Sequence, residues 1–227
     1  MKPGIAGRQL LRFNRRATSA VIDRRYSAAD MNPWYGKAAF FVAMLGYAVI
    51  RGPHGKRSRT VRVTEDRKDT LDAILLTGVF LGTVVLPMLW VFAGFPAQAD
   101  YPLHPLPYAL GLGLLVAGMW LFHRSHVDLG VNWSVTLQLR ENHGLIATGI
   151  YQRIRHPMYA SLFLISIAHV LFLPNWIVGP AYLGSFMVLY IFRVAREERM
   201  MLDRFGAEYE NYMRRTGRLL PPLRQPG

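Results

Sequence analysis

Long apolar segments separated by basic ones constrain this chain more than any other feature. Of its 227 residues, 52% are hydrophobic, and they gather in runs of roughly membrane length. This pattern is typical of a small integral membrane protein rather than a soluble domain. We therefore predict an all-α fold, a polytopic bundle of about five transmembrane helices. The predicted spans are Trp34–Ile50, Ile74–Ala93, Pro107–Phe122, Met158–Leu173 and Trp176–Phe192.

The formal net charge of +13 indicates membrane surfaces rather than nucleic acid as the partner. Lys and Arg gather beside the apolar segments, where the positive-inside bias and anionic headgroups explain them. The chain has no cysteine, which excludes disulfides, thiolate metal sites and a cysteine nucleophile. His123 and His126 have helical spacing but no evident carboxylate partner. We predict membrane lipids as partners, no nucleic acid and no metal.

Loop charge predicts which ends of the spans share a side of the membrane. Residues 51–70, residues 123–157 and the C-terminus are rich in Lys and Arg, whereas residues 95–104 carry only Asp100. The positive-inside bias places the basic loops in the cytoplasm. The short turn at Pro174 then lies on the far side. The bias of Arg over Lys and the short chain favour a bacterial inner membrane, with the endoplasmic reticulum as the alternative.

Residues 1–30 form a basic tail before a single membrane domain that we assign to residues 31–227. The tail carries seven Lys and Arg against two Asp and lacks the apolar core of a secretory signal, although its composition overlaps with that of a transit peptide. Loop charge puts the start of the first helix outside, in conflict with this tail. Either that helix does not fully span, or the tail is atypical. Met31 would itself make a reasonable chain start.

A first polar cluster stands at the start of the fourth predicted span. A residue before proline is pushed out of the α region, while proline suits the first turn of a helix. We therefore expect His156 to be extended just before a helix that opens at Pro157. The positive end of that helix, with Arg155 beside it, would suit a carboxylate or phosphate. The alternative is an ordinary membrane helix with arginines at the headgroups.

A second polar cluster follows the fifth span, and the hairpin between the two clusters returns both to one side. Arg193 and Glu197 are four residues apart, so they share a helix face. The same spacing continues through Met201, Phe205, Tyr209 and Met213. This apolar continuation predicts that the charged pair faces protein or a cavity. The alternative is a surface ion pair, although Arg before Glu is the weaker order.

Five motifs occur in order within residues 131–221. They are Asn132-Trp133-Ser134, His143-Gly144-Leu145-Ile146-Ala147-Thr148-Gly149-Ile150-Tyr151, Arg155-His156-Pro157-Met158-Tyr159, Glu197-Glu198 and Phe205-Gly206-Ala207-Glu208-Tyr209-Glu210-Asn211-Tyr212. This set resembles the isoprenylcysteine carboxyl methyltransferase and phospholipid methyltransferase superfamily. The resemblance implies a membrane-embedded methyltransferase that uses S-adenosyl-L-methionine without a soluble Rossmann fold. It also implies a cofactor pocket on the cytoplasmic side, closed by the C-terminal helix.

The resemblance further implies roles for single residues. The cofactor pocket would be lined by His143, Leu145, Ile146, Tyr151, His156, Pro157, Met158, Tyr159 and Glu197. Arg193 matches the position that meets the acceptor substrate, so Arg193 and Glu197 are the predicted catalytic residues. The chemistry agrees, because the cofactor carries a carboxylate suited to a helix N-terminus and a sulfonium suited to aromatic faces.

The predicted acceptor is lipophilic, and an isoprenylcysteine-type carboxylate is the first choice. A carboxylate is already ionised, so positioning by Arg193 would supply most of the acceleration. A phospholipid amine or a small thiol stays open, and either would need Glu197, Glu198 or His156 as a base. Sterol-type reductases, which use NADPH, resemble the same region, although Pro157-Met158-Tyr159 favours methyl transfer. A non-catalytic membrane scaffold is the third alternative.

Overall fold

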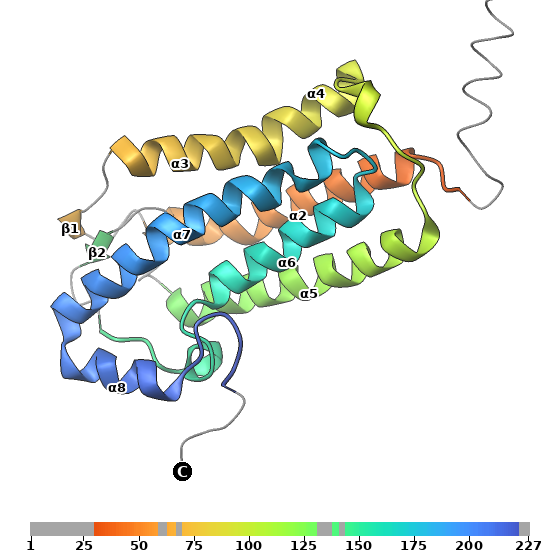
Figure 1. The fold of residues 1–227 in the computed structure, drawn as a ribbon. Coiled ribbons are helices and arrows are strands. Elements are labelled where there is room, and N and C mark those ends of the chain that lie inside the picture. The colour runs from red at the N-terminus through yellow and green to blue at the C-terminus, as the bar shows by residue number, and fades with distance from the viewer. Residues whose placement is uncertain (1–29, 59–62, 67–69, 131–137, 141–143, 223–227) are drawn as a thin grey trace, which may run out of the picture.

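The computed structural model describes residues 30–58, 63–66, 70–130, 138–140 and 144–222. Most of the basic tail, and His143, therefore lie outside the described residues. Long helices run side by side as one bundle (Figure 1). The elements are α2 (Trp34–Ser58), β1 (Val63–Asp66), α3 (Thr70–Phe80), η1 (Leu81–Val85), α4 (Leu86–Ala93), η2 (Ala97–Ala99), α5 (Pro105–Leu129), β2 (Gln138–Arg140), η4 (Gly149–Gln152), α6 (Pro157–Phe172), α7 (Val178–Phe205) and α8 (Ala207–Arg215).

Each predicted span overlaps a helical segment, although Ile74–Ala93 covers α3, η1 and α4 together. The predicted helical membrane bundle is confirmed. In the part of the chain that the structure describes, three segments are long and apolar enough to cross a membrane: Thr70–Ala93, Pro105–Leu129 and Val178–Phe205. Helix α6 is apolar but shorter, with 16 residues. The spanning of α2 and α6 therefore stays a prediction. The protein is a multi-pass membrane protein whose exposed large apolar side chains suit contact with lipid.

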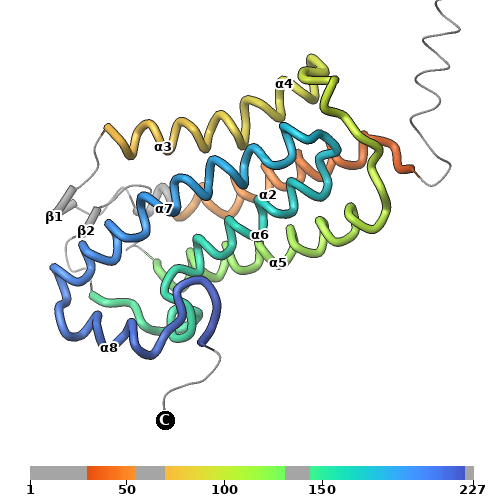
Figure 2. Tube along the Cα trace, in the orientation of Figure 1, coloured from red at the N-terminus to blue at the C-terminus, as the bar shows by residue number. Residues whose placement is uncertain are grey.

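Helix α7 lies at the centre of the arrangement. The segment α3–α4 runs along one side of it and α6 along the other, with α5 beyond α6 (Figure 2). A π-helical turn, η1, ends two residues before Pro87, which cannot donate the backbone hydrogen bond of a regular helix. In that turn a Cβ on Gly82 would lie 2.7 Å from the Ala181 carbonyl oxygen. The glycine thus allows α7 to approach closely.

The connecting segments meet at two opposite ends of the bundle, in the grouping that loop charge predicted. At one end, Tyr101 donates to the Pro174 carbonyl over 3.1 Å and Met31 donates to the Leu103 carbonyl over 2.8 Å. At the other end, β1 and β2 pair antiparallel. This pairing joins the two basic loops, which therefore share an end. The short sheet itself was not predicted.

Helix α7 ends earlier than the spacing of apolar residues suggested. Gly206 has a φ of 51°, a conformation that favours glycine over other residues. Helix α7 ends there, and α8 begins at Ala207. The prediction that Tyr209 and Met213 continue the Arg193 face on a single helix is therefore wrong. Both residues belong to α8, which packs back against the site described below.

Candidate functional site

The start of α6 has the predicted boundary at Pro157, but the prediction that His156 is extended is wrong, because its ψ of 59° lies outside the extended region. His156 is non-helical, with φ −123° and ψ 59°, and Pro157 opens the helix. The backbone N–H of His156 donates to the Arg218 carbonyl over 3.0 Å, and that of Arg155 donates to the Gly217 carbonyl over 2.8 Å. The segment before α6 is therefore held by the chain's C-terminal segment, which leaves the helix N-terminus fixed in place.

His156, Arg193 and Glu197 meet at this end of the bundle. The Arg193 Nε lies 3.3 Å from Glu197 Oε1, and the His156 Nδ1 lies 3.7 Å from Glu197 Oε2. The Arg193 side chain is 6% exposed and that of Glu197 23%. The structure thus places the two predicted polar clusters in one buried site. The Glu197 carboxylate keeps the larger exposure of the charged pair.

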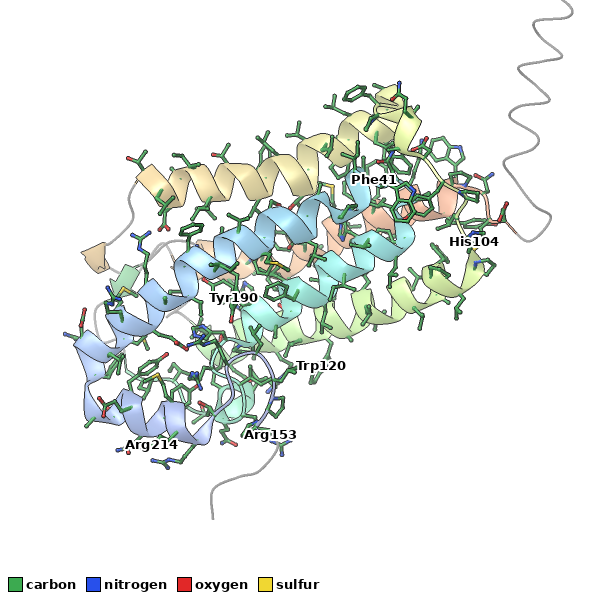
Figure 3. The ribbon with its side chains drawn as sticks, in the orientation of Figure 1. Phe41, His104, Trp120, Arg153, Tyr190 and Arg214 are labelled. Carbon is green, nitrogen blue, oxygen red and sulfur yellow. The ribbon has the colours of Figure 1, made fainter. Side chains whose placement is uncertain are left out.

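Aromatic rings form a wall beside these charges. The Tyr159 ring is buried and stacks on His156, with centroids 5.5 Å apart and planes 27° apart. It meets Tyr190 edge-on at 5.4 Å. Tyr190 lies on α7. Figure 3 shows it part-way along the bundle, with Arg153 and Arg214 at the end where α8 lies. Aromatic faces beside a carboxylate suit a ligand with a positive charge.

The carboxylate of Glu198, the residue after Glu197, contacts three side chains of the protein itself. Its carboxylate lies 3.2 Å from both Arg155 Nε and His156 Nε2, and 3.1 Å from Arg218 Nε. The carboxylate in turn raises the pKa of the Arg218 guanidinium above its usual value. Glu198 therefore joins α7, the start of α6 and the C-terminal segment. It is a structural junction beside the candidate site.

The segment before α6 contributes a second wall, against α8. A cavity of about 300 Å³ lies between them, lined by Leu145, Ala147, Gln152, Glu208, Tyr212, Arg215 and Thr216. The Tyr151 side chain is buried, and its hydroxyl donates to the Ser125 carbonyl over 3.4 Å. Burial raises the pKa of Tyr151 well above its ordinary value.

The other predicted site residues fall into two groups. Pro157 is buried and Met158 half-buried at the start of α6, close to His156. Ile146 is half-buried in the loop before η4, next to Leu145. His143 lies outside the described residues. The structure therefore gathers the α6 and α7 residues in one cluster and places Leu145 at the cavity against α8.

Sequence reasoning missed two contributors to this region. Asp72, in the first turn of α3, is 2% exposed and lies 3.5 Å from Arg196 Nη1. An acidic residue beside an apolar span is itself a signal for function, and it could have been noted. Arg218 gave no such signal, because its contact with Glu198 depends on the return of the C-terminal segment.

The donor set suits a polar organic ligand rather than a metal. Among the residues that the structure describes, no group of three or more His, Asp and Glu side chains could hold a metal ion. A partly exposed carboxylate at Glu197, the N-terminus of α6 and the Tyr159 ring suit hydroxyls, a carboxylate and a cation respectively. These are groups of S-adenosyl-L-methionine, so the residues present fit that cofactor.

The fold and this buried ionic site define a helical, multi-pass membrane protein with a polar site at one end of its bundle. Residues 110–203 match the model of the isoprenylcysteine carboxyl methyltransferase (ICMT) family. These residues run from α5 to α7 and include Arg193 and Glu197. The resemblance inferred from the ordered motifs is therefore confirmed over this region.

Named relatives agree with the family match. The chain is 30% identical over 114 residues to the protein-S-isoprenylcysteine O-methyltransferase of Tribolium castaneum, covering 49% of this chain and 41% of that protein. It is 30% identical over 115 residues to that of Schizosaccharomyces pombe, covering 48% of each. The chain thus spans less than half the length of these two relatives.

Two further matches cover more of the chain at lower identity. Protein-S-isoprenylcysteine O-methyltransferase B of Arabidopsis thaliana is 24% identical over 151 residues, covering 66% of this chain and 77% of that protein. A solved structure of the eukaryotic intramembrane Ras methyltransferase ICMT aligns with a TM-score of 0.48 at 20% identity, covering 81% of this chain and 62% of that chain.

Proposed function

We propose that this protein transfers a methyl group from S-adenosyl-L-methionine to a lipophilic acceptor, with an isoprenylcysteine-type carboxylate as the substrate. One observation carries the proposal: His156, Arg193 and Glu197 meet in one buried site within the region that matches the methyltransferase family. The names of the relatives support the same reaction. The cofactor, when bound, supplies an electrophilic methyl group on a sulfonium.

The proposed roles follow from the chemistry of each side chain. Glu197 accepts hydrogen bonds from cofactor hydroxyls, because its carboxylate is partly exposed and already held by Arg193 and His156. The N-terminus of α6, at Pro157, holds the cofactor carboxylate. The Tyr159 ring, stacked on His156, faces the positive charge. His143, Leu145, Ile146, Tyr151 and Met158 complete the proposed cofactor-binding set.

Arg193 orients the acceptor. A carboxylate acceptor is ionised at neutral pH, so the protein does not have to remove a proton. The protein then has only to hold the two reactants in line. Well-oriented reactants react at high effective molarity, so such positioning can supply most of the acceleration. A buried guanidinium is suited to this role, since it can hold a carboxylate by two hydrogen bonds. We further propose that the site opens to the cytoplasm, because the basic loops lie at its end of the bundle.

Binding and turnover by detergent-purified protein test the proposal. S-adenosyl-L-methionine should bind, and the protein should methylate an N-acetylated farnesylcysteine but not the corresponding amide, which lacks an ionised carboxylate. Binding of NADPH instead would indicate a reductase. Binding of neither would indicate a scaffold. Methylation of a phospholipid amine or a small thiol, but not of the carboxylate, would keep the reaction class and replace the substrate.

A further inference from the structure

Asp72 is a buried acidic residue that the proposed reaction does not yet use. It lies in the first turn of α3, outside the residues that match the family model. Its side chain is 3% exposed, and its Oδ1 is 3.5 Å from Arg196 Nη1 on α7. Burying a carboxylate in an apolar bundle is costly unless positive groups compensate it. Its surroundings therefore indicate a specific role.

The arginine that contacts Asp72, Arg196, stands close to the proposed acceptor residue on α7. Arg196 follows Arg193 by three residues, so the two guanidinium groups are neighbours on α7. Asp72 also acts electrostatically on Arg193, less strongly than Tyr159 and Glu197 do. The Arg193 guanidinium is therefore attracted by carboxylates from two helices, one on α7 itself and one on α3.

The packing of α3 against α7 fixes the position of Asp72. Ten residues further along the chain, Gly82 allows the backbone to approach Ala181 and Ser185 closely. The contact of Asp72 with Arg196 and the contact of Gly82 with Ala181 occur in opposite order along the two segments, as antiparallel packing requires. Two separated contacts of this kind hold the end of α3 in one register. Asp72 therefore holds a fixed negative charge against Arg196, about one helical turn from Arg193 on α7.

We infer that Asp72 is a positioning residue for Arg193. This inference rests on the methyl transfer proposed above. The Asp72 carboxylate offsets the attraction of Glu197 and keeps the Arg193 guanidinium from pairing fully with its own helix neighbour. The guanidinium then stays directed to the acceptor carboxylate. Glu197 in turn remains available to the cofactor. The acceptor end of the site thus depends on a residue from α3.

Two variants separate this role from a general structural one. Asp72→Asn should raise the KM for N-acetylated farnesylcysteine by about tenfold, equivalent to about 1.4 kcal/mol. Arg196→Ala should raise it in the same direction, because Asp72 then draws Arg193 away from the acceptor. Both should leave the Kd for S-adenosyl-L-methionine within about twofold, since Glu197 is retained. Asp72→Glu, which restores the charge, should recover part of the acceptor affinity.

Asp203→Asn is the matched control. It removes one negative charge from an exposed position on α7. The KM for the acceptor and the Kd for S-adenosyl-L-methionine should both stay at the wild-type values. If wild type methylates the acceptor but both variants keep its KM, the inference about Asp72 is overturned while the proposed function stands. Equal losses of cofactor and acceptor affinity would also overturn it. If Asp72→Asn does not fold, Arg196→Ala decides. An inactive wild type would overturn both proposals.

Discussion

The imidazole of His156 and the carboxylate of Glu198 are 42 residues apart in the chain, yet Nε2 and Oε1 lie 3.2 Å apart. The other ring nitrogen lies 3.7 Å from Glu197. One histidine at the start of α6 therefore contacts two adjacent carboxylates of α7. The two glutamates differ in exposure, since Glu198 is 9% exposed and Glu197 23%. This difference divides their expected roles between structure and ligand binding.

Replacement of Glu198 by alanine should destabilise the protein strongly. It would leave Arg155 buried without its carboxylate and His156 with Glu197 alone, and breaking a buried pair in this way costs about 3 kcal/mol or more. Unfolding in detergent, followed by circular dichroism, measures the effect. Arg218→Ala is the control, because that side chain is 49% exposed and a pair with so exposed a partner should contribute roughly 1 kcal/mol or less. Equal effects would contradict the assignment of Glu198 as a junction.

Replacement of Glu197 by glutamine should act on binding instead. A hydrogen bond to a charged group contributes about 1.5 to 3 kcal/mol, so the affinity for S-adenosyl-L-methionine should fall by at least about tenfold. Isothermal titration calorimetry measures this affinity. The unfolding transition should move less than in Glu198→Ala, because the glutamine oxygen can still accept a hydrogen bond from the buried Arg193. Glu210→Gln, at an exposed position of α8, should bind as wild type does. Unchanged affinity in Glu197→Gln would remove this residue from the proposed cofactor site.

The membrane helices and the core of the site could be predicted because their signals are local. Apolar runs set the helices, the His156-Pro157 dipeptide set the start of α6, and spacing by four set the Arg193 and Glu197 pair. The apolar hairpin then required both clusters to return to one end. Each step needed only periodicity or the stereochemistry of proline.

Contacts between residues far apart in the chain could not be predicted in this way. The pairing of Arg155 with Gly217 depends on a chain reversal after α8, and no periodicity reports it. Asp72 meets Arg196 across 124 residues. The break at Gly206 had a local signal, since glycine tolerates positive φ. The regular spacing of apolar residues across it concealed the change of helix.

Replacement of Gly149 by alanine tests how η4 is built. Gly149 has a φ of 60°, and a Cβ there would lie 2.3 Å from Asp128 Oδ2. The same oxygen accepts the Ile150 N–H over 2.8 Å. The left-handed backbone alone costs a non-glycine residue about 1 to 2 kcal/mol, and the clash adds to it. The expected result is a lower unfolding temperature and faster trypsin cleavage at Arg153. Gly144→Ala is the control and should match wild type, because a Cβ at that position meets open space.

Alkaline pH should weaken the attachment of α8. Burial raises the pKa of Tyr151, Tyr209 and Tyr212 above the ordinary value near 10. Above about pH 10 the unfolded chain loses protons that the folded protein keeps, so the free energy of unfolding falls as pH rises. The Tyr212 hydroxyl donates to the Tyr151 carbonyl over 2.7 Å, which ties α8 to η4.

Tyr212→Phe separates the hydrogen bond from the titration. Its loss should cost about 1 kcal/mol at neutral pH and make the decline above about pH 10 shallower, because one titrating group is gone. Thermal unfolding from about pH 8 to about pH 11, with ultraviolet absorbance of tyrosinate, measures both effects. Tyr35→Phe, at an exposed position of α2, should leave the decline unchanged. Ionisation of all tyrosines near pH 10 in the folded protein would contradict the burial of Tyr151, Tyr209 and Tyr212.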